Sequence, residues 1–141
     1  MSPDTSAASA ATDVRPGRAS ARTGLVITIL VDLFLLFDCV TKLIQLPAVV
    51  TGTVQLGFPA YTVPVMGALL LICLIVYNVP RTAVFGAVLL TGYLGGAVCA
   101  NVRAELPLFG YVLAPVYVAV LAWLGLYLRS PALRQLVRSS R

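Results

Sequence analysis

Residues 24–46 read GLVITILVDLFLLFDCVTKLIQL, and this stretch decides the class of fold. An α-helix rises 1.5 Å per residue, so a helix of this length spans about 34 Å. The hydrocarbon core of a bilayer is roughly 30 Å thick. Because nearly all of these residues are apolar, we predict that residues 24–46 form a membrane-spanning helix.

The same stretch carries three ionisable side chains, Asp32, Asp38 and Lys42. Each charge near the middle of a span opposes insertion by roughly 2.5–3.5 kcal/mol, whereas each Leu, Ile, Val or Phe favours it by only about 0.3–0.6 kcal/mol. The cost of the three charges and the gain from the many apolar residues nearly cancel, so this helix is only marginally stable in a membrane by itself. We therefore expect neighbouring helices to pack around its polar side chains.

The rest of the chain can supply those neighbours. The sequence is 60% hydrophobic and only 11% charged, whereas about a quarter of the residues in soluble domains are charged. Further apolar stretches cover about residues 61–77, 82–100 and 108–128, and residues 47–60 form an uncharged loop. We predict an all-α membrane protein in which residues 23–129 form a bundle of four transmembrane helices.

Positive charge lies at the two ends of this apolar body. Residues 1–22 have no apolar period and are typical of a disordered tail, and residues 130–141 form a basic tail that can include a short amphipathic helix. Together with the turn at Arg81, eight arginines fall on one side of a four-span bundle. Because Lys and Arg are retained on the cytoplasmic side, we predict that both termini are cytoplasmic. The tails hold no aromatic residues, which argues against nucleic-acid binding.

Asp38 and Lys42 are four residues apart, so they lie on one face of a helix and can pair. Gln45 extends this polar face. Two interpretations stay open: a ligand or proton site, which is the usual role of ionisable groups in a membrane, or a structural salt bridge. Asp32 projects about a third of a turn away and has no partner in its own helix. We expect its carboxyl group to be protonated or hydrogen-bonded, and it is the stronger functional candidate.

The third apolar stretch contains a GxxxG motif, Gly92 and Gly96, with Gly95 beside it. Small residues at this spacing let another helix approach closely. We expect these three glycines to serve helix packing within the bundle rather than between copies of the chain. Room for the tail of a ligand beside Gly95 and Gly96 is the alternative.

Motifs that would support catalysis are missing from the sequence. Cys39, Cys73 and Cys99 lie inside apolar stretches without CxxC spacing, so packing is favoured over a redox pair. The chain has no histidine, which excludes bis-histidine haem ligation and the usual histidine-based metal sites. No nucleotide-binding or hydrolase motif occurs. We predict no catalytic residue, no metal site and no cofactor held by the chain alone.

A series of short sequence blocks is also informative, and GAVLLTGYLGGA at residues 86–97 is the most specific of them. The others are LFD (36–38), KL (42–43), LGFP (56–59), VPRTA (79–83), PLF (107–109) and WLGLYLR (123–129). Over about residues 24–136 the chain resembles the DoxX-like family of small bacterial membrane proteins. The resemblance implies a four-helix fold in the bacterial inner membrane.

The resemblance implies less about activity. The family takes its name from a small subunit of a thiosulfate:quinone oxidoreductase, and other members are linked to oxidative-stress or thiol-redox complexes. Related sequences carry a histidine where this chain has Asn101, so redox or proton chemistry by that histidine is not expected here.

Three functions follow as hypotheses. The leading one is an accessory subunit of a membrane redox complex, or a protein that binds a quinone or lipid among the first three spans. Its partners would be membrane lipid and a redox enzyme or another membrane subunit. The alternative is a small proton-coupled transporter that uses Asp32 or Asp38. A membrane enzyme acting through one of the cysteines ranks last.

Overall fold

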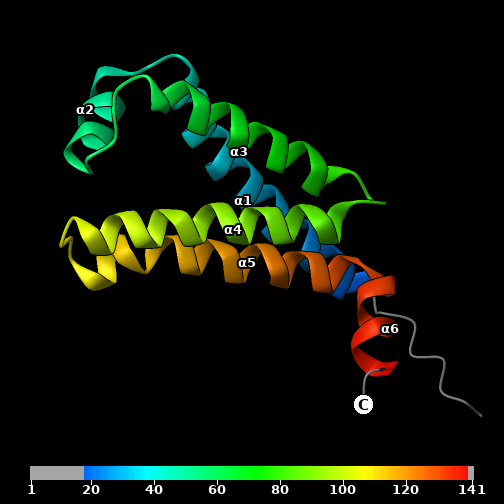
Figure 1. The fold of residues 1–141 in the computed structure, drawn as a ribbon. Helices are drawn as coiled ribbons and strands as arrows, with labels where there is room; N and C mark the ends of the chain where they lie inside the picture. The colour runs from blue at the N-terminus through cyan, green and yellow to red at the C-terminus, as the bar shows by residue number, and fades with distance from the viewer. Residues whose placement is uncertain (1–17, 140–141) are drawn as a thin grey trace, which may run out of the picture.

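The computed structural model describes residues 18–139, and within that range the chain is a bundle of helices without strands (Figure 1). The elements in chain order are α1 (Arg18–Leu43), α2 (Pro47–Gln55), α3 (Thr62–Asn78), α4 (Ala83–Arg103), the π-helical turn η1 (Leu108–Val112), α5 (Ala114–Arg129) and α6 (Pro131–Ser139). The prediction of an all-α fold is confirmed.

Among the described residues, three segments are long and apolar enough to cross a membrane: Ala19–Leu43, Ala83–Arg103 and Leu108–Arg129. The α3 helix is also apolar but has only 17 residues. Its length of about 25 Å is less than the roughly 30 Å of a bilayer core. Many large apolar side chains are exposed, which is typical of a protein surrounded by lipid. The count of four spans stays a prediction.

The first span differs from the predicted 24–46 at both ends. The α1 helix begins at Arg18, so residues 18–22 are helical rather than part of a disordered tail; residues 1–17, the rest of that predicted tail, lie outside the described residues. The helix ends at Leu43, and Gln45 adopts a φ of 53°. Pro47 follows closely, and the residue before a proline avoids helical geometry, so the helix stops before Leu46.

Two further differences arise from proline. The predicted loop 47–60 contains the helix α2, which has Pro47 in its first turn, where a fixed φ favours helix initiation. The predicted last span, 108–128, is divided into η1 and α5, and Pro115 occupies the first turn of α5. Proline fits there because its fixed φ suits the start of a helix. The expected short helix in the basic tail is α6.

One face of α1 builds much of the core. Thr28, Val31, Leu35 and Cys39 are buried, at the spacing of three or four residues that places them on one helical face. The α1 helix packs against α3 and α5, and α4 packs against the same two helices. The four long helices therefore follow one another around the bundle in the order α1, α3, α4, α5.

The bundle is tight at the end where α3 leads into α4. A Cβ atom on Gly86 would collide with the backbone of Val76 and Tyr77, so the last turn of α3 contacts the first turn of α4 directly. Gly24 and Gly125 allow a similar approach between α1 and α5. The buried hydroxyl of Tyr77 donates a hydrogen bond to a carbonyl oxygen of α5, 2.8 Å away.

Two arginines stabilise this tight end. Arg129 donates to the carbonyl oxygen of Tyr77 at 3.2 Å and lies 5.2 Å from the centre of the Tyr77 ring. Arg134 of α6 donates to the carbonyl oxygens of Tyr127 and Leu128. The last carbonyl groups of a helix lack helical partners, and these arginines donate hydrogen bonds to such groups at the ends of α3 and α5. The start of α1 (blue) and α6 (red) lie at this same end (Figure 1).

At the opposite end the bundle separates into two pairs. The α1 and α3 helices stay in contact, since a Cβ on Gly67 would meet Lys42 and Cys39 at 3.0–3.2 Å. The α4 and α5 helices also stay together, while α3 diverges from α4 towards α2 (Figure 1). The space between the two pairs is where the candidate site lies.

Candidate functional site

A cavity of about 640 Å³ lies between the α1–α3 pair and the α4–α5 pair. All of the long helices contribute to its wall, together with η1 and the segment that begins in α2 and ends at Phe58. Ligand pockets in proteins typically measure about 300–1,000 Å³. The cavity is therefore large enough for a small organic molecule or the head of a lipid.

The cavity wall is polar at one end and apolar at the other. Both α1 and α4 run towards the open end of the bundle, and their last lining residues are the polar Lys42 and Asn101. Deeper positions are occupied by Phe34 on α1, Leu94 on α4 and Val118 on α5. A mainly apolar cavity with a few polar groups at one end suits an amphiphile whose head lies near α2.

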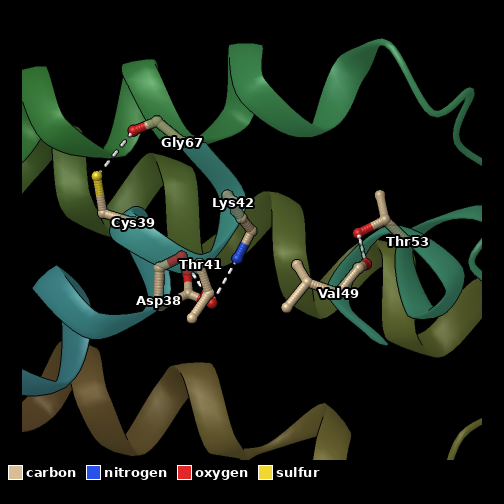
Figure 2. Close-up of polar contacts among 7 residues, drawn as sticks. All are labelled: Asp38, Cys39, Thr41, Lys42, Val49, Thr53 and Gly67. Carbon is tan, nitrogen blue, oxygen red and sulfur yellow. Dashed lines mark hydrogen bonds and ion pairs between the residues drawn. The ribbon is translucent and has the colours of Figure 1, made fainter. Parts of the chain in front are cut away.

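The polar end is built around the pair formed by Asp38 and Lys42. The ammonium Nζ of Lys42 donates to Oδ1 of Asp38 at 2.5 Å (Figure 2). Both side chains belong to the cavity wall, and 15% of the Lys42 side chain and 37% of the Asp38 side chain are exposed. The pair is neutral as a whole, but its remaining N–H groups and its second carboxylate oxygen can still bind the polar groups of a ligand.

Breaking this pair is expected to destabilise the fold. In the variant Lys42→Met, Asp38 keeps its carboxylate but loses its cation, and we expect the free energy of unfolding to fall by about 1–2 kcal/mol. The double variant Asp38→Asn/Lys42→Met removes both charges and should recover most of this loss. Unfolding by SDS titration in mild detergent measures both values. Equal instability of the single and double variants would contradict the role of the ion pair.

Asn101 and Tyr93 also line the cavity, and the sequence did not place either of them at the site. The side-chain amide of Asn101 donates to the carbonyl oxygen of Tyr111 at 2.8 Å. Pro115 has no N–H, so it cannot bond this carbonyl four residues before it. Asn101 supplies the missing donor from the neighbouring helix. The signal available in the sequence was the combination of Pro115 inside one apolar span with an amide side chain, Asn101, at the end of another.

The three glycines of the third span do not behave alike. Gly92 and Gly96 line the cavity, and Gly95 does not. Apart from the neighbouring residues and the backbone of α4 itself, nothing in the described part of the chain lies within 4 Å of a Cβ atom built on any of them. The close approaches between helices occur at Gly24, Gly86 and other positions instead. Helix packing through the GxxxG motif stays a prediction.

The structure separates the other two predicted polar residues from the pair. Gln45 lies in the turn after α1, is exposed, and does not line the cavity. Asp32 lines a different depression of about 310 Å³ between α1 and α3, together with Asn78. Its Oδ1 atom is buried and has no hydrogen-bond partner among the described residues. Asp38 and Lys42 thus form one site, and Asp32 belongs to another.

The cysteines do not form a shared centre. Cys39 and Cys73 are buried and Cys99 is exposed, and all three are free thiols. Cys39 donates to the carbonyl oxygen of Gly67 at 3.2 Å (Figure 2), which joins α1 to α3. Between Arg18 and Ser139, no group of three or more His, Cys, Asp or Glu side chains is placed to hold a metal ion.

Comparison with known proteins gives a match to one family. The chain matches no curated protein and no solved structure. The sequence profile of the DoxX-like family matches residues 26–125, from the third turn of α1 to the second half of α5. This range includes the Asp38–Lys42 pair, the cavity and the Asp32 depression. More than half of the sequence is matched, so the chain belongs to the DoxX-like family.

Proposed function

We propose that this protein binds a quinone or a lipid in the cavity between its two helix pairs and serves a membrane redox complex as an accessory subunit. The observation that carries the proposal is the cavity itself, with apolar walls in its deeper part and the Asp38–Lys42 pair at its open end. The pair is neutral as a whole, so it suits a neutral head group with oxygen acceptors better than a charged one.

The proposed setting is the bacterial inner membrane, which α3 crosses together with the three longer segments, with both termini in the cytoplasm. Four crossings are supported by the position of the described ends, since the start of α1 and the helix α6 lie at the same end of the bundle (Figure 1). Arg22, Arg129 and Arg134 lie there too, and Arg81 lies in the turn between α3 and α4 at that end. A basic end of this kind is retained on the cytoplasmic side.

The accessory role is supported by the family. Some of its members are linked to oxidative-stress or thiol-redox complexes, and this chain has a cavity that can hold a ligand. A small bundle that holds an amphiphile beside an enzyme can deliver that amphiphile or retain it near the enzyme's own centre.

The test is to identify what the chain retains. The full-length protein is purified in mild detergent from bacterial membranes that contain quinones, and bound molecules are extracted and identified by mass spectrometry. We expect about one quinone or lipid per chain, enriched several-fold over its share of the membrane. Recovery of the protein with no enriched amphiphile would contradict the binding function.

The geometry favours binding over the transporter alternative. A proton-coupled transporter of this size needs a carboxylate that is free to exchange protons and cations in the transport path. Asp38 lies in the cavity but is held by Lys42 at 2.5 Å. Asp32 lacks such a partner but lies outside the cavity. Proton-coupled efflux by vesicles that is lost in Asp32→Asn would support the transporter instead.

A further inference from the structure

The depression around Asp32, which we call the Asp32 groove, lies between α1 and α3 and has a volume of about 310 Å³. Asp32 and Asn78 are its polar residues, and every other lining residue is Leu or Ile. Several of these apolar side chains are exposed, including Leu33 and Ile75. The groove therefore opens on a surface of the bundle that suits contact with lipid or with another transmembrane helix.

The carboxyl group in this groove is incompletely satisfied within the chain. The side chain of Asn78 interacts with it, but Oδ1 has no hydrogen-bond donor among residues 18–139. Arg129 acts on the group through its charge, and its guanidinium contacts the carbonyl oxygen and the ring of Tyr77. Asp38, by contrast, has its own lysine. Of the two carboxyl groups in α1, one is paired within the chain and the other is not.

We propose that the Asp32 groove is the docking site for a transmembrane helix of a partner subunit, and that this helix carries a Lys or Arg that pairs with Asp32. Lipid tails offer no hydrogen-bond donor, so a carboxyl group facing them is costly. A basic side chain from a neighbouring helix removes that cost. A donor that enters through the groove would meet the Asp32 side chain where it lines that groove.

The depth of Asp32 fits such a partner. Asp32 lies level with Asn78, the last residue of α3, and therefore towards the basic end of the bundle. Lys and Arg are most common in a transmembrane helix near its cytoplasmic end, where their long side chains reach the interface. A transmembrane helix that lies alongside the groove can place a basic residue level with Asp32. That residue then lies near the basic end of the bundle and not at the bilayer centre.

A second copy of this chain is a poorer occupant. Lys42 is paired with Asp38, and Arg129 and Arg134 bind the carbonyl oxygens that end α3 and α5. A copy would have to break one of these contacts or supply Arg22 or Arg81 from the ends of its helices. The inference rests on the accessory-subunit part of the proposed function and is independent of what the cavity binds.

A designed peptide tests the inference without a known partner. The probe is a synthetic transmembrane helix of Leu and Ala with one Lys in its cytoplasmic third, and the matched probe has Leu at that position. The full-length protein carries a fluorescent dye on Cys99, which is exposed whereas Cys39 and Cys73 are buried. Energy transfer between this dye and a second dye on the probe measures their association in phosphatidylcholine vesicles. We expect the Lys probe to bind about tenfold more tightly than the Leu probe.

Two variants decide the outcome. Asp32→Asn keeps the shape of the side chain and should remove the preference for Lys, whereas Asp38→Asn, which changes the cavity about a third of a turn away on α1, should keep it. Equal binding of the two probes, or a preference that survives Asp32→Asn, would overturn the inference. Association between copies of the protein that disappears in Asp32→Asn would overturn it in favour of a dimer. Retention of a quinone or lipid in the same preparations separates failure of this inference from failure of the binding function.

Discussion

Alanine at Gly86 is expected to destabilise the bundle by about 3 kcal/mol, the largest effect that we expect of a methyl group at any glycine in the described part of the chain. A Cβ atom at this position would lie against the backbone of Val76 and Tyr77. Backbone atoms cannot turn aside as a flexible side chain can, so the first turn of α4 must move away from the last turn of α3. That movement also disturbs Tyr77, whose hydroxyl and carbonyl groups bind α5 and Arg129.

Gly95→Ala is the matched control for this prediction. Gly95 lies in the same helix, and nothing lies within 4 Å of the position that an alanine methyl group would take there. The free energy of unfolding should change by less than about 1 kcal/mol, and alanine's higher helix propensity favours a gain. SDS titration and thermal unfolding in detergent measure both variants. A similar loss of stability in the two would show that Gly86 has no special place in the packing.

Gly86 also illustrates what the sequence could not predict. The GxxxG motif at Gly92 and Gly96 drew attention to the middle of α4, whereas the tight contact lies at the start of that helix. A motif of small residues shows that close approach is possible but not which face of the helix meets a neighbour. That choice depends on the angle between α3 and α4, which is fixed by the short turn before Ala83 and by the packing of both helices.

The positions of the long helices were predictable because long apolar stretches with polar boundaries have few other solutions. The Asp38–Lys42 pair was predictable for a similar reason, since residues four apart must be neighbours on a helix. The separation of Asp32 from that pair also followed from helical geometry. The cavity was not predictable, because it arises from the divergence of two helix pairs. The helix α2 was missed because its sequence has no clear apolar period.

The second large effect is expected from filling the cavity at Gly96. This glycine lines the cavity, and nothing lies within 4 Å of a Cβ atom built on it. The variant Gly96→Leu therefore places a branched side chain in the open space without displacing another helix. We expect the amount of quinone or lipid retained after purification to fall at least about tenfold, while thermal unfolding in detergent changes little.

Gly95→Leu makes this test specific to the cavity. Gly95 has equally open surroundings but does not belong to the cavity wall. Both variants add the same side chain to adjacent positions of α4, so they share any effect on helix propensity or membrane insertion. Only Gly96→Leu changes the space in which the head and tail of an amphiphile would lie. If both variants retain as much amphiphile as the unmodified chain, the bound molecule occupies another surface, and the cavity loses its role in binding. If Gly96→Leu alone loses it, the retained molecule lies between the two helix pairs.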